Sequence, residues 1–186
     1  MPSDLVQRVN LDFLYPPFLS RLLEVLADAR ALGQDYFVIS GYRNHKEQDA
    51  LYAQGRSTPG KKVTNARGGF SAHNWGIAVD VVADVSQKRG LQPSWEKAFY
   101  NKLKQAASPH DLQVGVPGLQ DDGHIQLPLT SVLQRREVDI FKDFNALYAS
   151  GGMPAVWAQL DAWGFANGSR LVAVASGIPP SAAPKG

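Results

Sequence analysis

The chain has 186 residues, 44% of them hydrophobic, which is enough to bury one good core, so we expect one domain with room for an appendage. A formal net charge of only +2, with basic residues that do not cluster along the sequence, argues against a nucleic-acid partner. The absence of cysteine excludes disulfides and thiolate ligands, so histidine and carboxylate side chains must hold any metal.

The apolar runs and the first residues of the sequence indicate whether the chain has a membrane span or a signal peptide, and so where in the cell it is expected. No apolar run approaches the roughly 20 residues that a membrane span needs, so no transmembrane segment is expected. Residues 1–20 lack the basic region, apolar stretch and cleavage site of a signal peptide. We therefore expect a chain that is made in the cytoplasm and needs another agent to release it if it works outside.

Hydrophobic spacing and turn residues predict an alternation of helices and strands, typical of an α+β fold. The predicted elements are, in chain order, a helix over 17–32, a strand over 35–40, a helix over 44–55, a loop over 56–72, a strand over 75–82, a helix over 94–107, strands over 111–116 and 124–127, and helices over about 132–149 and 154–163. Asn44 followed three residues later by Glu47 is the pattern of a capping box. The strand over 75–82 is apolar on both faces, which predicts a central position in the sheet.

The helix over 94–107 is predicted from its amphipathic spacing. Ser94 is expected to cap it. Its apolar positions, Trp95, Phe99 and Leu103, are expected to be buried.

The last sixty residues carry two helical patterns and then lose them. Gly151 and Gly152 separate the patterns, and Pro154 suits a first helical turn. Trp157, Leu160 and Trp163 recur at spacings of three, which favours packing over a carbohydrate platform. The last residues of the chain are rich in Pro, Ser and Ala, which indicates a flexible tail.

One aspartate in the central strand raises a chemical question. Asp80 stands between two valines, where an unpaired carboxylate would be costly. His73 precedes the strand, and His124 opens another short apolar strand directly after Asp121 and Asp122. Two histidines and one carboxylate are the ligand set of a catalytic zinc site that keeps its fourth position open. A further carboxylate nearby would serve as general base.

Three segments carry a resemblance to a known family. "SAHNWGIAVD" (71–80) resembles the S-x-H-x-x-G-x-A-x-D motif of the VanY-like family of zinc D-alanyl-D-alanine carboxypeptidases and L-alanyl-D-glutamate endopeptidases, which cleave peptidoglycan stem peptides. "GGFSAHN" (68–74) is similar to the phage endolysin branch of that family. "SGYRNHKEQDALY" (40–52) and "DDGHIQL" (121–127) resemble its S-G-Y-R…Q…L-Y and D-x-P-H-F-[EQ] segments, so the resemblance covers about residues 35–127.

The resemblance implies a fold and a metal. The fold would be Hedgehog/DD-peptidase-like, an α+β arrangement in which helices flank a small antiparallel sheet. One Zn²⁺ per chain would be held by His73, Asp80 and His124.

The resemblance also implies roles around that metal. Arg43 would steady the scissile carbonyl, and Asp121 would be the general base, with Asp122 as the rival for that role. Gln48 and Ser71 would bind substrate or orient a ligand. Histidines 45 and 110 are expected to lie outside the site.

The implied function is that of a zinc metallopeptidase acting on bacterial peptidoglycan. We expect an L-alanyl-D-glutamate endopeptidase that works as a monomeric, phage-type endolysin and reaches the wall at host lysis. The alternatives are a D-alanyl-D-alanine carboxypeptidase and, in another class, an inactive wall-binding module. The predicted organisation is a zinc peptidase domain over 1–130, a helical extension packed on it over 131–167, and a tail over 168–186.

Two positions depart from the family pattern. Gly123 stands where proline is usual, and Ile125 where an aromatic residue is usual. We expect the glycine to loosen the turn that aims the base.

Overall fold

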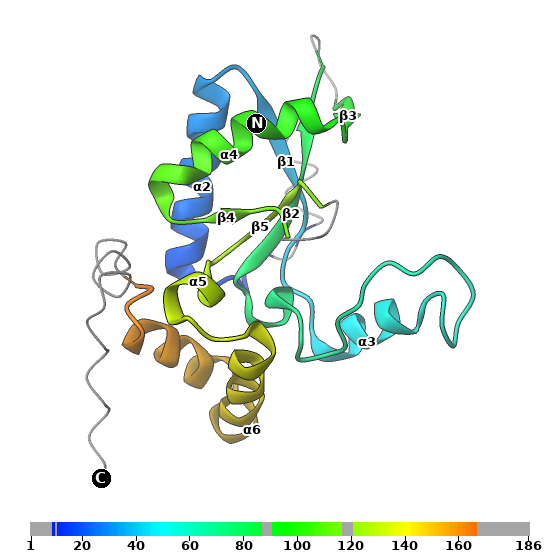
Figure 1. The fold of residues 1–186 in the computed structure, drawn as a ribbon, viewed down its shortest axis with the longest axis vertical. Coiled ribbons are helices and arrows are strands. Elements are labelled where there is room, and N and C mark those ends of the chain that lie inside the picture. The colour runs from blue at the N-terminus through cyan, green and yellow to red at the C-terminus, as the bar shows by residue number, and fades with distance from the viewer. Residues whose placement is uncertain (1–8, 10, 87–90, 117–120, 167–186) are drawn as a thin grey trace. The chain divides into compact units, whose positions relative to one another are not determined.

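The computed structural model describes residues 9, 11–86, 91–116 and 121–166 (Figure 1). The predicted tail over 168–186 lies outside the described residues. The chain divides into two compact units, Met1–Leu127 and Pro128–Gly186. How the C-terminal extension packs on the first unit stays a prediction. In the described part of the chain, no helix combines the length and apolarity needed to cross a membrane.

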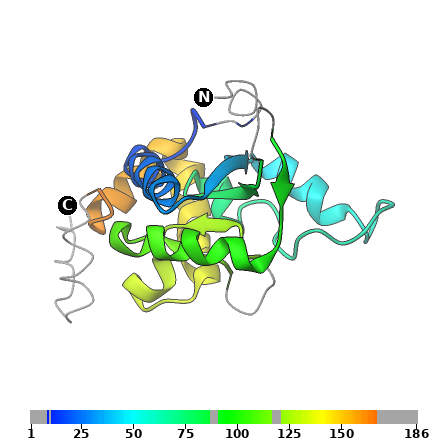
Figure 2. The same ribbon diagram turned by 90° about the horizontal axis from the view of Figure 1, so that it is seen from above.

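The first unit is an antiparallel sheet with helices packed around it (Figures 1 and 2), as predicted for an α+β fold. The strands run in the order β1-β2-β5-β4, and β3 pairs with the far end of β2. The elements of this unit are α2 (Pro16–Ala31), β1 (Asp35–Ser40), α3 (His45–Ala53), the 3₁₀ helix η1 (Ala72–Trp75), β2 (Ala78–Asp84), β3 (Pro93–Ser94), the 3₁₀ helix η2 (Lys97–Phe99), α4 (Tyr100–Ala107), the 3₁₀ helix η3 (Ser108–His110), β4 (Gln113–Val114) and β5 (His124–Gln126).

β2 is the central strand, as its apolar sequence predicts. It pairs with β1 along most of its length, with β5 at its start and with β3 at its end. Val79, Val81 and Val82 are almost completely buried, so both faces of the strand are covered. A rigid, doubly covered strand is a firm support for the one carboxylate in its middle.

Two helices cover the sheet and pack on each other. α2 lies against both α4 and β1 (Figures 1 and 2). Its buried stripe, Phe18, Leu22, Val25 and Ala29, recurs every three to four residues, as expected for one face of a helix.

The segment before α4 differs from the prediction. Pro93 and Ser94 stay extended because they pair with the end of β2, so α4 begins only at Tyr100 and Ser94 does not cap it. Leu103 is buried as predicted, but Trp95 is 66% exposed. The prediction of a buried Trp95 is therefore wrong.

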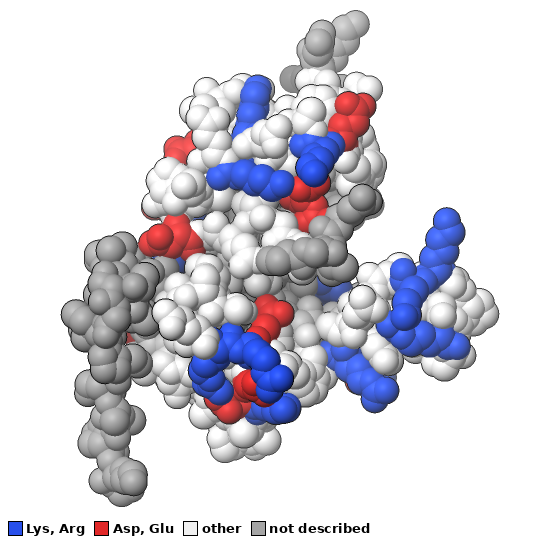
Figure 3. All heavy atoms as spheres, in the orientation of Figure 1, with Lys and Arg blue, Asp and Glu red and all other residues white. Residues whose placement is uncertain are grey.

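α3 begins with the predicted capping box. Asn44 Oδ1 accepts from the Glu47 N–H at 2.9 Å, and Glu47 Oε2 accepts from the Asn44 N–H at 2.8 Å. The loop that follows, predicted over 56–72, carries Lys and Arg side chains that gather on one part of the surface (Figure 3). The sequence contains no acidic residue between positions 49 and 80, so the low net charge hides a local cluster of cations that we did not expect.

The second unit contains α5 (Leu129–Leu133) and α6 (Glu137–Ala162). The predicted single helix over 132–149 is wrong at its start, because the left-handed Gln134 (φ 50°) ends α5 and α6 begins only at Glu137. The predicted break at the glycine pair is confirmed, since Gly152 has φ 66° and ψ −162° inside α6. Within this unit the rings of Phe144 and Trp163 stack at a centroid distance of 5.6 Å.

Candidate metal centre

The strand register brings the first pair of site residues together. Asp80 on β2 lies directly opposite His124 on β5. His124 Nδ1 lies 2.9 Å from Asp80 Oδ1, and its Nε2 lies 2.8 Å from Gln126 Oε1. The amide oxygen of Gln126 only accepts, so Nε2 carries a proton and Nδ1 faces the carboxylate.

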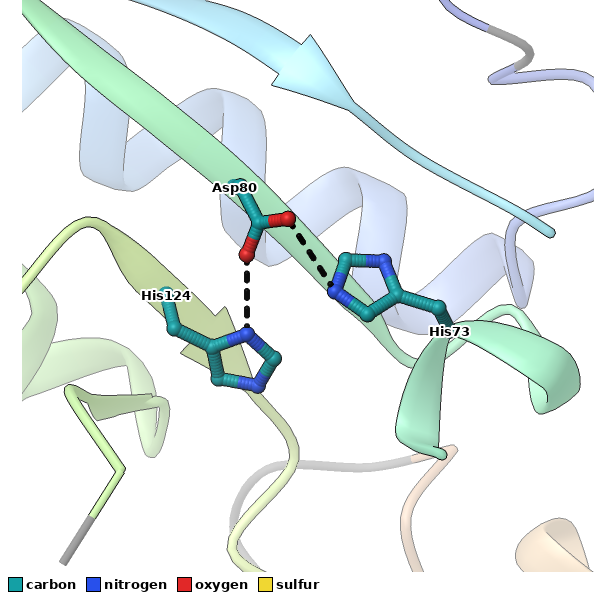
Figure 4. A group of neighbouring side chains, drawn as sticks. All are labelled: His73, Asp80 and His124. Atoms are coloured by element: carbon teal, nitrogen blue, oxygen red, sulfur yellow. Dashed lines mark hydrogen bonds and ion pairs between the residues drawn. The ribbon is translucent and has the colours of Figure 1, made fainter. Parts of the chain in front are cut away.

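His73 approaches the same carboxylate from η1. Its Nδ1 lies 2.8 Å from the Gly41 carbonyl oxygen, to which it donates, and its Nε2 lies 3.3 Å from Asp80 Oδ2. Figure 4 shows both imidazoles pointing at Asp80. One potential ligand atom from each of the three residues lies within 4.8 Å of the others.

A glycine fixes how the chain passes from η1 to β2. Gly76 ends η1 with φ 69°, a left-handed conformation that other residues rarely adopt. A Cβ atom there would lie 2.2 Å from the Phe13 carbonyl oxygen. The glycine of the sequence motif is therefore required by the backbone that places His73 at the entrance of β2.

The three residues perturb one another's titration. Burial alone would raise the pKa of Asp80, but hydrogen bonds with His124 and His73 hold it far below its ordinary value. Burial lowers the pKa of His73. Burial also opposes the charged form of His124, but the Asp80 carboxylate and Gln126 outweigh it and raise the pKa of His124.

This donor set fits zinc. Two imidazole nitrogens and a carboxylate are the ligand types that zinc takes in catalytic sites. His73 and His124 each hold an acceptor on the ring nitrogen that faces away from Asp80, which fixes the tautomer a metal needs. The buried charge of Asp80 would then have a compensating partner, which answers the question that its position in the sequence raised.

The two aspartates before His124 have different surroundings. Asp122 Oδ1 accepts from Lys104 Nζ at 2.6 Å, and that hydrogen bond lowers the pKa of Asp122. Asp121 is in contact with solvent, yet partial desolvation and then the nearby Asp80 charge raise its pKa. Of the two side chains, only that of Asp121 is therefore influenced by the charges of Asp80 and the two histidines.

Arg43 also interacts electrostatically with the site. Its Nη2 lies 3.7 Å from Asp80 Oδ2. Burial lowers the pKa of Arg43, although Asp80 works in the opposite direction. The Arg43 backbone N–H donates to the His73 carbonyl oxygen at 3.2 Å, so the two motif segments are joined at this point.

Asn74 joins the same segments and was missed by the sequence analysis. Its Oδ1 accepts from the N–H groups of Gly69 (2.9 Å) and Ser71 (3.2 Å), and its Nδ2 donates to the Arg43 carbonyl oxygen at 2.8 Å. The side chain is almost completely buried. An amide between the histidine and the tryptophan of the motif was the available signal, because a buried amide needs several partners.

Gln48 and Ser71 support the site through the backbone. Gln48 is completely buried and donates to Thr64 Oγ1 (3.2 Å) and the Ala66 carbonyl oxygen (2.9 Å), so it anchors the loop after α3. This burial argues against direct substrate contact and favours the supporting role. Ser71 contributes its backbone N–H to Asn74.

Gly123 has a different role from the one expected. A Cβ atom at this position would lie 2.4 Å from the Val81 carbonyl oxygen, and the Gly123 carbonyl accepts from the Val81 N–H at 2.9 Å. The glycine thus lets the turn pack directly on β2. The expectation that it loosens the turn is not supported by this close contact.

The remaining histidines lie outside the group of His73, Asp80 and His124, as expected. The ring of His45 packs edge-on against Trp75 at 5.1 Å. The ring nitrogens of His110 lie 3.0 Å from Glu24 and 2.8 Å from Asp28. His110 therefore links η3 to α2.

A cleft of about 430 Å³ opens beside the group of His73, Asp80 and His124. Its lining consists of Ile39, Asp80, Val81, Trp95, Lys97, Tyr100, Asp121, Asp122 and Gly123. Asp80 and Asp121 thus face a space large enough for part of a peptide.

Three comparisons with known proteins found matches to this chain. The VanY family, described as D-alanyl-D-alanine carboxypeptidase, matches residues 13–124. The peptidoglycan L-alanyl-D-glutamate endopeptidase CwlK of Bacillus subtilis (strain 168) is 46% identical over 84 residues, which are 45% of this chain and 48% of that protein. The chain thus spans about half the length of this curated relative. The crystal structure of the L-Ala D-Glu endopeptidase ChiX from Serratia marcescens is similar with a TM-score of 0.47, at 22% identity, over 69% of this chain and 90% of that one.

Proposed function

The chain belongs to the VanY family, and from that membership we propose that it is a zinc-dependent hydrolase of peptide bonds in peptidoglycan stem peptides. The observation that carries the proposal is the convergence of His73 Nε2 and His124 Nδ1 on the carboxylate of Asp80. All three residues lie within the matched range.

In this proposal His73, Asp80 and His124 hold one Zn²⁺ per chain. When bound, the ion supplies a Lewis acid that polarises the substrate carbonyl and makes water more acidic. The chain's own contribution is to fix the tautomers of the two histidines through Gly41 and Gln126.

Asp121 acts as general base and then as general acid. It accepts a proton from the attacking water as the water oxygen bonds to the carbonyl carbon, and it returns that proton to the leaving amine as the C–N bond breaks. Its raised pKa suits both tasks, because a carboxylate that binds a proton more readily is the stronger base. Arg43 provides a positive charge for the oxygen that becomes negative in the tetrahedral intermediate.

The bond that we propose is the one between L-alanine and D-glutamate. The endopeptidase named above supports this choice, because it shares 46% identity over 84 residues with this chain. The family description supports a second candidate, removal of terminal D-alanine. The setting we propose is the cell wall, reached as a phage-type endolysin after release from the cell that makes the protein.

Digestion of purified muropeptides, followed by labelling of new amino groups and mass spectrometry, tests this function. Zinc-loaded protein should produce fragments with N-terminal D-glutamate. Release of free D-alanine alone would support the carboxypeptidase instead. No cleavage of either kind with zinc present would refute the proposed activity and favour a wall-binding module.

A further inference from the structure

The cleft is lined by the proposed base and also by residues that the proposed chemistry does not use. Asp80, Asp121, Trp95 and Lys97 all belong to its lining. Trp95 is 66% exposed, and Ile39, another lining residue, is 43% exposed. Large apolar side chains that stay exposed in a concave surface are typical of ligand-binding sites.

The fold holds Trp95 outside the core. Pro93 and Ser94 pair with the end of β2, and the chain stays extended through Glu96, which has φ −64° and ψ 127°. The tryptophan between them therefore cannot turn inward as part of α4. The Trp95 ring lines the cleft because the residues before it pair with β2. Its exposure does not result from a gap in the hydrophobic core.

Lys97 has no ion-pair partner among the described residues. Asp122 is close enough to feel its charge, but its carboxylate is bonded to Lys104 at 2.6 Å. Among the residues that the structure describes, no carboxylate lies within 4 Å of Lys97 Nζ. Three carboxylates line the same cleft, so an acidic ligand would be repelled unless a cation such as Lys97 received it.

The proposed reaction provides such a ligand. Glutamate has two carboxyl groups, and only one can continue the peptide, so D-glutamate in a stem peptide keeps a free carboxylate unless it is amidated. The leaving amine belongs to this same residue. Because Asp121 would protonate that amine, the D-glutamate must lie next to Asp121, in the cleft that Lys97 also lines.

We propose that Trp95 and Lys97 form a subsite for the leaving-group side of the substrate, in which Lys97 binds the free carboxylate of D-glutamate and Trp95 packs against the peptide. The inference rests on the proposed function and adds the chemical feature that selects the substrate. It makes the unmodified D-glutamate form of the stem peptide the preferred one.

Two synthetic stem peptides test the subsite, one with the free carboxylate of D-glutamate and one with that group amidated. Wild-type, zinc-loaded protein should prefer the first by about three- to tenfold in kcat/KM, the range of a charge pair in contact with solvent. Lys97→Met should lose this preference by slowing only the carboxylate peptide. Lys102→Met is the matched control, because Lys102 lies outside the cleft and donates to Gly33. It should keep the preference.

The Trp95 variants report on the other half of the subsite. Trp95→Ala should raise KM for both peptides alike, and Trp95→Phe should restore most of the loss. Removal of an exposed ring should leave the thermal midpoint unchanged. An unchanged KM in Trp95→Ala would overturn the role of the tryptophan.

The outcomes distinguish a failure of the carboxylate subsite from a failure of the proposed peptidase activity. If wild-type protein cleaves both peptides with equal kcat/KM, or if Lys97→Met slows both equally, the carboxylate subsite is refuted and the peptidase stands. If zinc-loaded wild-type protein cleaves neither peptide and no muropeptide, the proposed function is refuted and the subsite with it.

Discussion

Exchanging each of the two adjacent aspartates for asparagine separates catalysis from structure. Asp121→Asn removes the carboxylate that would take the proton, and the asparagine side chain has nearly the same shape as the aspartate. We expect kcat to fall by roughly 10²–10⁴-fold, the usual contribution of a general base. Zinc content should stay near wild type, because the exchange removes none of the three ligands. Partial desolvation and the nearby Asp80 raise the pKa of Asp121, so its charge opposes folding and its loss should not destabilise the protein.

Asp122→Asn is the matched control with the opposite pattern. It removes the negative charge from the 2.6 Å contact with Lys104 Nζ and leaves an amide oxygen as a neutral acceptor. The side chains are 27% and 40% exposed, so solvent screens the pair and its loss should cost less than about 1 kcal/mol of unfolding free energy. The value of kcat should stay close to wild type.

Three measurements on the two variants decide the assignment: zinc content, steady-state kinetics on the carboxylate stem peptide, and urea unfolding. The role of Asp121 as general base is refuted if Asp122→Asn is the inactive variant and Asp121→Asn is nearly as active as wild type. It is also refuted if Asp121→Asn loses zinc together with activity, because the carboxylate would then be a ligand.

Three further perturbations follow from the hydrogen bonds around the site and the sheet. Asn74→Ala removes the side chain that donates to the part-buried Arg43 carbonyl and accepts from the Gly69 and Ser71 N–H groups, so urea unfolding should show a loss of about 2 kcal/mol. Gln126→Leu removes the acceptor that orients His124, and zinc affinity measured against a competing chelator should fall about 10- to 100-fold; an unchanged affinity would contradict the role of Gln126. Asp84 accepts hydrogen bonds from two backbone N–H groups, which lower its pKa below 3.8 despite partial desolvation. Its stabilisation is therefore complete above that value and is lost as the pH falls through the lower folded-state pKa. Thermal melts of Asp84→Asn and wild type should differ at neutral pH, and the difference should shrink only as the pH falls below 3.8.

The site was predictable to the extent that it is encoded in short segments. The spacing of His73, Gly76 and Asp80 reflects one continuous stretch of backbone, and the capping box at Asn44 is a contact three residues apart. Such local relations can be read without knowing the fold. His124 was also found from its motif, and the strand register confirms that it meets Asp80.

What the sequence did not reveal depends on contacts between distant segments. Trp95 is exposed because the residues before it pair with β2, a long-range event that overrides the amphipathic pattern. The acidic partners of His110 are more than eighty residues away along the chain. The pairing of Asp122, and not Asp121, with a lysine follows from the position of Lys104 on α4, which no local pattern fixes.

Metal removal tests most directly the proposal that His73, Asp80 and His124 hold one zinc ion on which hydrolysis depends. Protein stripped by exhaustive chelation should lose its activity on muropeptides. Stepwise addition of zinc should restore that activity linearly and reach a plateau at about one ion per chain, the stoichiometry of a single three-ligand site. Full activity in the metal-free protein would contradict the zinc mechanism. Zinc restoring the same activity to His124→Ala as to wild type would contradict the role of His124 as a ligand.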